Sequence, residues 1–320
     1  MPQFSLHTPD RIRKEWIRLP TSPCNNAIAL ENKADNRYSD ILAMEDTRVK
    51  LSSTKYINAN HMQFEGCFQC IGTQAPMPNT FEHFWTMIID HRVELIVMLT
   101  KFVESKKIKA HCYWPDAGEP AVFGNVTVAF LDEIRFEENS TMRKFKVCRD
   151  GESLIVTHIQ YTGWPDFGTP KSSLEIRKIL RFCLDFVGQS TAPPVIHCSA
   201  GIGRAGTFIT LLYYFYSLEK AQNANGKLPT IFEIVSTLRK QRMNMVQTFE
   251  QYSFIYQTIS DELAPPEAAP PKNPELHQTQ VQLNNSNQSC RQSLHLSTSA
   301  PQRHRYIHND QDNLCYKVYQ

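Results

Sequence analysis

The stretch from Val195 to Thr207 constrains the fold of this chain more than any other part of its sequence. It reads V-I-H-C-S-A-G-I-G-R-A-G-T and follows two prolines, so a short apolar strand leads into a glycine-containing loop. The loop leads into residues 205–219, whose apolar side chains predict a helix. A strand, a tight loop and a helix in this order require a sheet on which helices pack. The stretch therefore predicts a domain of the α+β or α/β type.

The remaining sequence up to residue 263 predicts further elements of both kinds. Val93 to Leu99 is almost wholly apolar, which is typical of a buried strand. Apolar residues recur at helical spacing from Ser172 to Val187, and the early segments are short, β-rich and separated by turn residues. The predicted elements are strands over 93–99, 113–130, 145–161 and 193–196 and helices over 172–187, 205–219, 231–242 and 249–263. We therefore expect an α+β fold (α/β-type), with a central twisted mixed sheet flanked by helices.

The composition changes near residue 263. Residues 264–320 are rich in proline, asparagine, glutamine and serine and contain few large apolar side chains. Such a segment cannot bury enough apolar surface to offset its ordering entropy, so we predict one folded domain over 1–263 and a disordered tail over 264–320. Pro271-Lys272-Asn273-Pro274 is a minimal P-x-x-P motif. A plain linker is the favoured interpretation, and a weak SH3-type contact through the tail stays open.

Charge and hydropathy exclude several classes of protein. The chain has 34 Lys and Arg against 32 Asp and Glu, a net charge of +2, which argues against a strongly basic nucleic-acid binder. No apolar run approaches the roughly 18 residues of a membrane span. The N-terminus has no charged and apolar regions typical of a signal peptide, and Pro2 excludes N-myristoylation. We therefore expect a cytoplasmic protein with no membrane insertion.

The nine cysteines are an odd number and lie scattered along the chain, which predicts reduced thiols rather than a disulfide framework. Cys67 and Cys70 form a lone C-x-x-C motif. A zinc site needs a second pair of ligands at suitable spacing, and no such pair follows nearby. Two strand cysteines are the favoured interpretation, and we predict no metal site and no cofactor.

The loop after Val195-Ile196 contains a thiol and a guanidinium at a spacing that suits anion chemistry. Cys198 is followed after five residues by Arg204, with Gly201 and Gly203 between them. Between a strand and a helix, such a loop can direct successive backbone N–H groups at one point, where the helix N-terminus adds its dipole. This field favours the ionised thiolate of Cys198, and Arg204 can bind a tetrahedral dianion through two parallel N–H bonds. The pattern predicts phosphoryl transfer to sulfur; the alternative is a buried cysteine beside a glycine-rich turn.

A phosphoryl transfer to sulfur also needs a general acid for the leaving oxygen. Trp164-Pro165-Asp166-Phe167-Gly168 supplies a carboxyl group between turn residues. Asp166 is therefore the candidate that protonates the leaving group and later, as a carboxylate, activates water. A loop here can close over a ligand. Taken alone, the segment is equally consistent with a surface turn.

Together these segments resemble the family of classical, phosphotyrosine-specific, cysteine-dependent protein tyrosine phosphatases, over about residues 10–263. The matching motifs are Asn36-Arg37-Tyr38, Tyr56-Ile57-Asn58-Ala59-Asn60, Thr73-Gln74-Ala75-Pro76, Asn79-Thr80, Phe84-Trp85, Ile96-Val97-Met98-Leu99-Thr100, Glu104, Lys109, Tyr113-Trp114-Pro115, Trp164-Pro165-Asp166, His197 to Arg204, Arg239, Arg242, Met245-Val246-Gln247-Thr248 and Gln251-Tyr252. The resemblance implies the fold of that family and hydrolysis of phosphotyrosine in proteins through a phosphocysteine intermediate, with phosphotyrosine proteins as partners.

The resemblance also implies a role for each matching residue. Cys198 would be the nucleophile, Asp166 the general acid and then the general base, and Gln247 the residue that places the attacking water, with Gln251 assisting. His197 would orient the loop, Tyr38 would stack on the substrate ring, and Asp40 would bind the substrate backbone. The phosphate would be bound by Arg204 together with the backbone N–H groups of Ser199, Ala200, Gly201, Ile202, Gly203 and Arg204. No metal is needed, because Arg204 and these amides supply the positive charge.

Three positions depart from the family pattern. Ala205 replaces a usual Ser or Thr, whose hydroxyl is expected to hydrogen-bond the departing thiolate, so the second chemical step is affected. Asp35 replaces a usual Lys and changes the charge at the rim of the predicted pocket. Ala75 replaces a usual Gly, with no evident chemical consequence.

Three functions fit these residues. An active phosphotyrosine phosphatase is favoured by intact Cys198, Arg204, Asp166 and Gln247. An impaired phosphatase that binds phosphotyrosine proteins is the alternative that Ala205 and Asp35 leave open. A dual-specificity or lipid phosphatase would share the C-x5-R spacing, but the slot implied by Tyr38 is too deep for phosphoserine to fill.

Overall fold

The computed structural model describes residues 8–21, 26–53, 55–64, 68–165, 168–224 and 228–264. Asp166, Cys67 and the predicted tail with its Pro271–Pro274 motif lie outside these residues.

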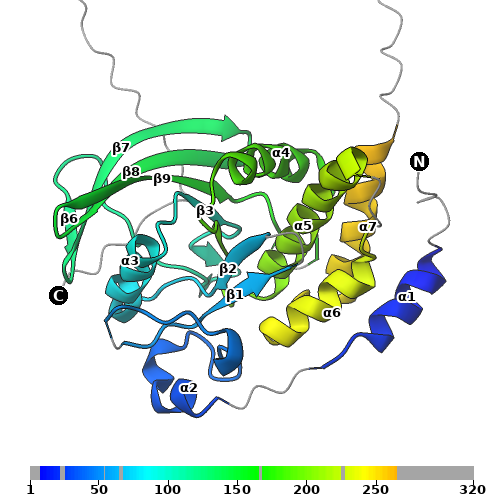
Figure 1. The fold of residues 1–320 in the computed structure, drawn as a ribbon, viewed down its shortest axis with the longest axis horizontal. Coiled ribbons are helices and arrows are strands. Elements are labelled where there is room, and N and C mark those ends of the chain that lie inside the picture. Colours follow the sequence, from blue (N-terminus) through cyan, green and yellow to red (C-terminus); the bar gives the residue numbers. More distant parts are fainter. Residues whose placement is uncertain are drawn as a thin grey trace, which may run out of the picture. The chain divides into compact units, whose positions relative to one another are not determined.

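A mixed sheet forms the centre of the domain (Figure 1). In the described part of the chain it has eight strands in the order β1-β2-β10-β3-β9-β8-β7-β6. Their bounds are β1 Ala59–Gln63, β2 Gln69–Thr73, β3 Leu95–Met98, β6 Ala121–Phe123, β7 Val126–Glu137, β8 Ser140–Arg149, β9 Glu152–Tyr161 and β10 Val195–His197. β2, β10, β3 and β9 run parallel, and the outer strands are antiparallel to their neighbours. The predicted class, a mixed sheet flanked by helices, is confirmed.

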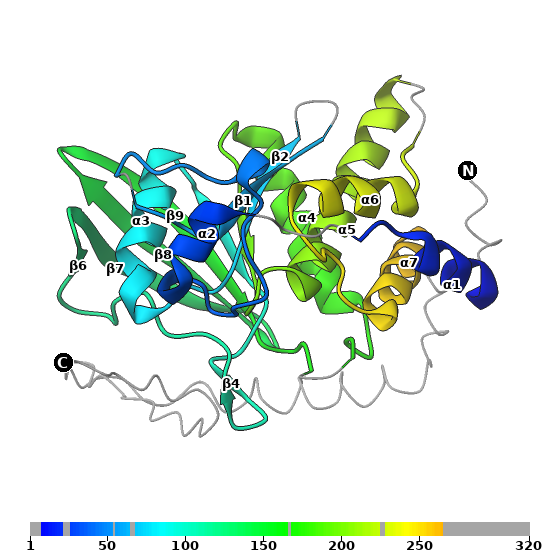
Figure 2. The same ribbon diagram turned by 90° about the horizontal axis from the view of Figure 1, so that it is seen from below.

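Helices cover both faces of the sheet (Figure 2). They are α1 Pro9–Arg18, α2 Ala27–Glu31, α3 Phe81–Asp90, α4 Leu174–Gln189, α5 Gly203–Ala224, α6 Ile231–Gln241 and α7 Phe249–Leu263. The alternation of side chains along β3 divides the core: Leu95 and Val97 pack with α4 to α7, whereas Ile96 and Met98 pack with α3. Because both faces are covered, the central strand β3 is apolar and buried throughout, as predicted for Val93 to Leu99.

The carboxyl ends of the four parallel strands meet at one edge of the sheet. His197 pairs with Thr73 on one side and with Met98 on the other, and Met98 pairs with Gln160. The segments that follow these strands, 74–76, 99–104, 162–165 and 198–202, therefore begin side by side. In sheets of this kind, ligands bind beyond the carboxyl ends of the strands.

The predicted helices are confirmed within two or three residues, except that α5 extends to Ala224, but the earlier part of the chain differs from the prediction. α1 and α3 lie where short strands were expected. Thr8 caps α1 by accepting a hydrogen bond from the Arg11 N–H at 3.4 Å, and Pro9 opens the helix, so its start signals were present in the sequence. In α3, residues 83–89 are all buried, and the helical spacing of the polar residues Glu82, Thr86 and Asp90 was passed over.

The antiparallel strands also differ in their boundaries. Residues 114–120 form no strand, and the predicted strand over 145–161 is two strands, β8 and β9, joined at Asp150 and Gly151. Both joining residues have positive φ, 52° and 85°, as a two-residue hairpin turn requires. The Asp-Gly pair is a strong hairpin signal that the sequence prediction passed over.

No helix in the described ranges is long and apolar enough to cross a bilayer. The described cysteines, Cys70, Cys112, Cys148, Cys183 and Cys198, are all free. Cys70 lies in β2 as predicted, and complete burial raises the pKa of its thiol.

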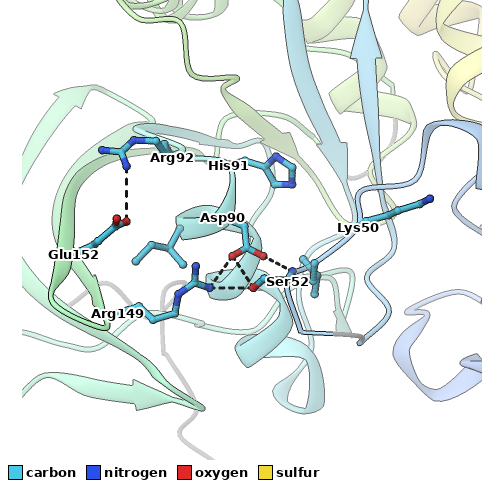
Figure 3. A pocket seen from close by; sticks show the side chains of 9 residues that line it. Lys50, Ser52, Asp90, His91, Arg92, Arg149 and Glu152 are labelled. Atoms are coloured by element: carbon cyan, nitrogen blue, oxygen red, sulfur yellow. Dashed lines mark hydrogen bonds and ion pairs between the residues drawn. The ribbon is translucent and has the colours of Figure 1, made fainter.

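One hollow of about 480 Å³ lies at the amino-terminal ends of β3 and β9 (Figure 3). Asp90 at the end of α3 accepts hydrogen bonds there from the N–H and hydroxyl of Ser52, and it pairs with Arg149 at 2.7 Å. None of the predicted site residues lines this hollow, which is at the opposite end of β3 from the 198–202 loop.

Candidate active site

The 198–202 loop joins the end of β10 to the start of α5 and is held on its outer side by hydrogen bonds to its carbonyl groups. The contacts are His197 Nδ1 to Cys198 O at 3.0 Å, the Ala75 N–H to Ser199 O at 2.9 Å, Arg242 Nη2 to Ala200 O at 3.0 Å and Arg242 Nε to Gly201 O at 2.9 Å. In a planar trans peptide, a C=O and the following N–H point in opposite directions. The N–H groups of residues 199–202 therefore point away from these partners and toward the inside of the loop, which creates a site for an anion.

Gly201 is required by this conformation. Its φ is +71°, in the left-handed region, and a Cβ there would overlap the carbonyl oxygen of Thr73 at the end of β2. The loop thus lies directly against the strand beside β10.

Arg242 is the residue of this site whose role the sequence analysis missed. It is fully buried, and besides the two loop carbonyls it donates to Asn60 Oδ1 at 2.7 Å and to Asn58 Oδ1 at 2.8 Å. The asparagines of the Tyr56–Asn60 motif therefore orient the guanidinium that orients the loop. A buried arginine is costly unless its N–H groups are paired, and these four acceptors provide that pairing.

Arg204 is fixed by the segment that follows β3. Its Nη1 and Nη2 contact Oε1 and Oε2 of Glu104 at 2.6 and 2.7 Å, and Nη1 also donates to Thr100 Oγ1 at 3.2 Å. Glu104 ends β4 (Val103–Glu104), which forms a small hairpin with β5 (Lys107–Ile108). A bidentate pair of this kind fixes the plane of the guanidinium as well as its position.

The segment that ends at Pro165 contacts the guanidinium of Arg204. Arg204 Nη2 donates to the Pro165 carbonyl at 3.2 Å, and Trp164 is buried and donates its indole N–H to Gly168 O at 3.2 Å. Asp166 itself lies outside the described residues, so its position is not part of the observed geometry.

Tyr38 lies beside the 198–202 loop. Ser199 Oγ donates to the Lys109 carbonyl at 2.7 Å, so the Tyr38 hydroxyl donates to Ser199 Oγ at 2.8 Å. The neighbouring Arg37 points inward and donates to the carbonyls of Ala75 and Pro76, both at 2.9 Å, which anchors the segment. Asp40 is exposed two residues further on.

Asp35 faces the next segment rather than the 198–202 loop: its carboxylate accepts from the Asn79 amide at 2.9 Å. Ala75 is fully buried, and its N–H donates to Ser199 O.

Gln247 and Gln251 lie against Gly203, the first residue of α5. A Cβ built on Gly203 would be 3.2 Å from Gln247 Oε1 and 2.9 Å from Gln251 Nε2. Gln247 is exposed and its N–H donates to Gln251 Oε1 at 2.9 Å. The preceding Val246 has φ of +55°, which is strained for a β-branched residue, and its N–H donates to Ile202 O at 3.0 Å. This bond ties the turn before α7 to the loop.

Ala205 is fully buried in the first turn of α5. Thr207, the nearest hydroxyl in sequence, donates its proton to the Gly203 carbonyl at 3.0 Å. That proton is therefore not available to the sulfur of Cys198.

His197 is buried and neutral. Burial lowers its pKa to about 4, while the contact with the Cys198 carbonyl acts in the opposite direction. Its Nε2 lies 2.8 Å from the hydroxyl of Tyr113, which in turn lies 2.9 Å from Nε2 of His158. Sequence reasoning assigned no role to His158.

Comparison with known families decides the classification of this chain. The model of the protein-tyrosine phosphatase family matches residues 32–261, more than half of the chain. The chain belongs to the protein-tyrosine phosphatase family. The resemblance inferred from the motifs is thereby confirmed.

Known members of the protein-tyrosine phosphatase family give the extent of the similarity. Mouse tyrosine-protein phosphatase non-receptor type 20 is 38% identical over 78% of this chain and 58% of its own length. The protein-tyrosine-phosphatase PTP1 of Arabidopsis thaliana is 33% identical over 81% of both chains. The solved catalytic domain of human protein tyrosine phosphatase non-receptor type 18 superimposes with a TM-score of 0.73 at 28% identity, covering 82% of this chain and 99% of that domain. The chain thus spans a little over half of the mouse relative.

Proposed function

We propose that this chain is an active phosphotyrosine-protein phosphatase. The observation that supports the proposal best is the set of four outward-held carbonyls in the 198–202 loop, which directs N–H groups inward beside Cys198. A phosphate bound there would meet the thiolate of Cys198 and the guanidinium of Arg204, which Glu104 orients.

The reaction proceeds in two steps. In the first, the Cys198 thiolate attacks phosphorus, the S–P bond forms, the bond to the tyrosine oxygen breaks, and that oxygen takes a proton from Asp166. In the second, a water molecule placed by Gln247 attacks phosphorus while its proton passes to the Asp166 carboxylate. The S–P bond then breaks, inorganic phosphate leaves and the thiolate is restored. The roles of Asp166, Gln247 and Gln251 rest on family resemblance, and the contacts of both glutamines with the Gly203 turn support theirs.

The position of Tyr38 beside the 198–202 loop favours phosphotyrosine as the substrate. The hydrogen bond between Tyr38 and Ser199 fixes an aromatic ring beside the anion loop, and exposed Asp40 follows at the rim. A phenyl phosphate can lie along such a ring, while the shorter side chain of phosphoserine leaves its phosphate out of reach. This argues against a dual-specificity or lipid phosphatase.

The replacement of Cys198 by serine tests the mechanism. Cys198→Ser should abolish hydrolysis of p-nitrophenyl phosphate and still bind phosphotyrosine peptides, because serine does not ionise near neutral pH and the loop amides remain. Wild-type protein should hydrolyse phosphotyrosine peptides and leave phosphoserine peptides and phosphoinositides intact. More than a few per cent of residual turnover in Cys198→Ser would exclude a phosphocysteine mechanism.

An impaired, phosphotyrosine-binding protein is the second candidate. Two observations favour it: position 205 has no hydroxyl, and the Thr207 hydroxyl donates its hydrogen bond to Gly203 O. A burst of product followed by slow turnover distinguishes this candidate from a fully active enzyme.

Two further proposals concern the whole chain. We propose a cytoplasmic location, where reducing conditions keep a reactive thiol such as Cys198 free; cell fractionation tests it. We also propose that residues 264–320 are a disordered tail, and limited proteolysis of the full chain tests that.

A further inference from the structure

Three hydrogen bonds connect His158, at the centre of β9, with the backbone of the catalytic loop. His158 Nε2 contacts the Tyr113 hydroxyl at 2.9 Å, this hydroxyl contacts His197 Nε2 at 2.8 Å, and His197 Nδ1 contacts the Cys198 carbonyl at 3.0 Å. The rings of His158, Tyr113 and His197 are all fully buried. Buried polar groups linked in series polarise one another, so the order of their protons matters.

The protons of His197 follow from its two contacts. A carbonyl oxygen only accepts, so His197 Nδ1 must bear the hydrogen. The ring is neutral near pH 7, because burial lowers its pKa to about 4. Its Nε2 is therefore an unprotonated acceptor, and the Tyr113 O–H must donate to it.

The same reasoning fixes the proton of His158. Once the Tyr113 hydroxyl donates to His197, its oxygen can only accept from His158, so His158 Nε2 bears a hydrogen. Burial, and then the charge of Arg143, lower the pKa of His158 well below its ordinary value, so this ring is also neutral. Its Nδ1 is then an unprotonated atom, and the backbone of His158 itself is its neighbouring polar group.

We propose that His158 is a positioning residue for the phosphatase reaction. It acts through Tyr113 and His197 on the Cys198 carbonyl. Because the Cys198 C=O and the Ser199 N–H point in opposite directions, the bond from His197 directs the Ser199 N–H into the anion site. His158 thus sets the direction of the first backbone donor beside the nucleophile from the far end of a buried chain. The inference rests on the proposed function of the loop.

The first experiment determines the protons directly. In ring-labelled full-length protein, long-range ¹H–¹⁵N correlation spectra show which ring nitrogen of each histidine bears hydrogen. We expect His197 protonated at Nδ1 and His158 protonated at Nε2 near pH 7. The opposite pattern at either ring, or a doubly protonated His197, would overturn the proposal whatever the enzymatic activity.

The second experiment uses variants and orthovanadate, an oxyanion that binds without turnover. His158→Phe removes the donor and keeps a ring, and the loss of one net hydrogen bond should weaken vanadate affinity about 2- to 13-fold. His197 should also lose its single-tautomer spectrum. His158→Gln places an N–H near the same point and should restore both. His83→Phe, a buried histidine of α3 outside this chain of bonds, is the matched control and should change neither.

Tyr113→Phe provides an independent route if His158→Phe folds poorly. It should reproduce the loss, and the double variant should lose no more than either single one, because both act through one chain of bonds. Unchanged vanadate affinity and an unchanged His197 spectrum in both single variants would refute the role of His158. Since these measurements need no hydrolysis, they remain decisive even where peptide assays contradict the proposed phosphatase activity.

Discussion

At position 205 the chain has a methyl group where its family leads us to expect a hydroxyl. The methyl group is fully buried in the first turn of α5, one residue after Arg204. A hydrogen bond to a departing thiolate contributes roughly 1.5–3 kcal/mol, and each 1.36 kcal/mol is about a factor of ten in rate. The absence of this bond should therefore slow hydrolysis of the phosphocysteine about 10- to 150-fold, with little effect on its formation.

Rapid-mixing kinetics test this expectation. Wild-type protein should release a burst of phenol and then turn over slowly. Ala205→Thr should raise kcat and shrink the burst with kcat/KM little changed, because kcat/KM reports only steps up to the first irreversible one. Ala205→Val has the shape of threonine without the hydroxyl and controls for packing. If wild-type protein shows no burst and the kcat of Ala205→Thr lies within about twofold of the wild-type value, a water molecule replaces the hydroxyl that position 205 lacks.

Individual residues of the site differ in how far the sequence predicted them. Cys198, Gly201 and Arg204 lie within seven residues, so their cooperation follows from local spacing. Arg242 contacts Gly201 across 41 positions, and His158 contacts Tyr113 across 45. No local pattern specifies such pairs; they result from strand order and from how α6 packs beside the loop.

The contact between α5 and the turn before α7 sets the place of Gln247. A Cβ at Gly206, in α5, would lie 2.5 Å from the Val246 nitrogen, so helix and turn touch backbone to backbone. Val246 is held there in the left-handed region, with its carbonyl bound to Arg239 Nη2 at 2.9 Å. The sequence predicted α5 and α7 but not this contact, because a glycine inside a helix does not reveal which backbone approaches it.

Gly206→Ala should therefore displace the turn that precedes Gln247. Overpacking of this kind costs about 1–3 kcal/mol of the free energy of unfolding, and a displacement near 1 Å lowers a rate by up to about 100-fold. We expect kcat to fall and phosphocysteine to accumulate, as measured by the burst of phenol. Gly188→Ala in α4 is the matched control, because nothing lies within 4 Å of the added Cβ. A Gly206→Ala enzyme with wild-type kcat would show that the contact does not place Gln247.

For the whole molecule, the buried histidines predict how the free energy of unfolding depends on pH. His197 has a pKa of about 4 when folded and an ordinary value of 6.5, so between these values the unfolded chain binds more protons. The free energy of unfolding should therefore fall as the pH falls below 6.5. From pH 6.5 to 5, His197 alone accounts for about 2 kcal/mol, and His158, whose pKa is also lowered, adds to it.

Urea unfolding monitored by tryptophan fluorescence at pH 8, 7, 6 and 5 measures this slope. Stability should be constant between pH 8 and 7 as far as these histidines are concerned and should drop steadily from pH 6.5 to 5. Carboxylates change the free energy of unfolding only at lower pH. The hydrogen bond with Arg48 lowers the pKa of Glu45, so the stabilisation by this carboxylate is lost only below about pH 4.5. Equal unfolding midpoints at pH 7 and 5 would contradict a neutral, buried His197.

The sequence predicted the fold class correctly and the boundaries of individual strands and helices less well. Apolar runs specify buried strands, so β3, β10 and the later helices were found. α3 was missed although Glu82, Thr86 and Asp90 recur at helical spacing, because the sequence analysis interpreted the early segments together as short and β-rich. The β8–β9 hairpin was merged because strand propensity continues on both sides of Asp150 and Gly151.

The attachment of the 198–202 loop to distant parts of the chain has a consequence for synthesis. A nascent chain contains Cys198 well before Arg242, the side chain that orients two of the loop carbonyls. Until α6 has been made and has packed beside the sheet, the carbonyl groups of Ala200 and Gly201 lack the partner that fixes their direction. The loop around Cys198 therefore takes its final backbone conformation only after residue 242 has left the ribosome, so the geometry of this site forms late in synthesis.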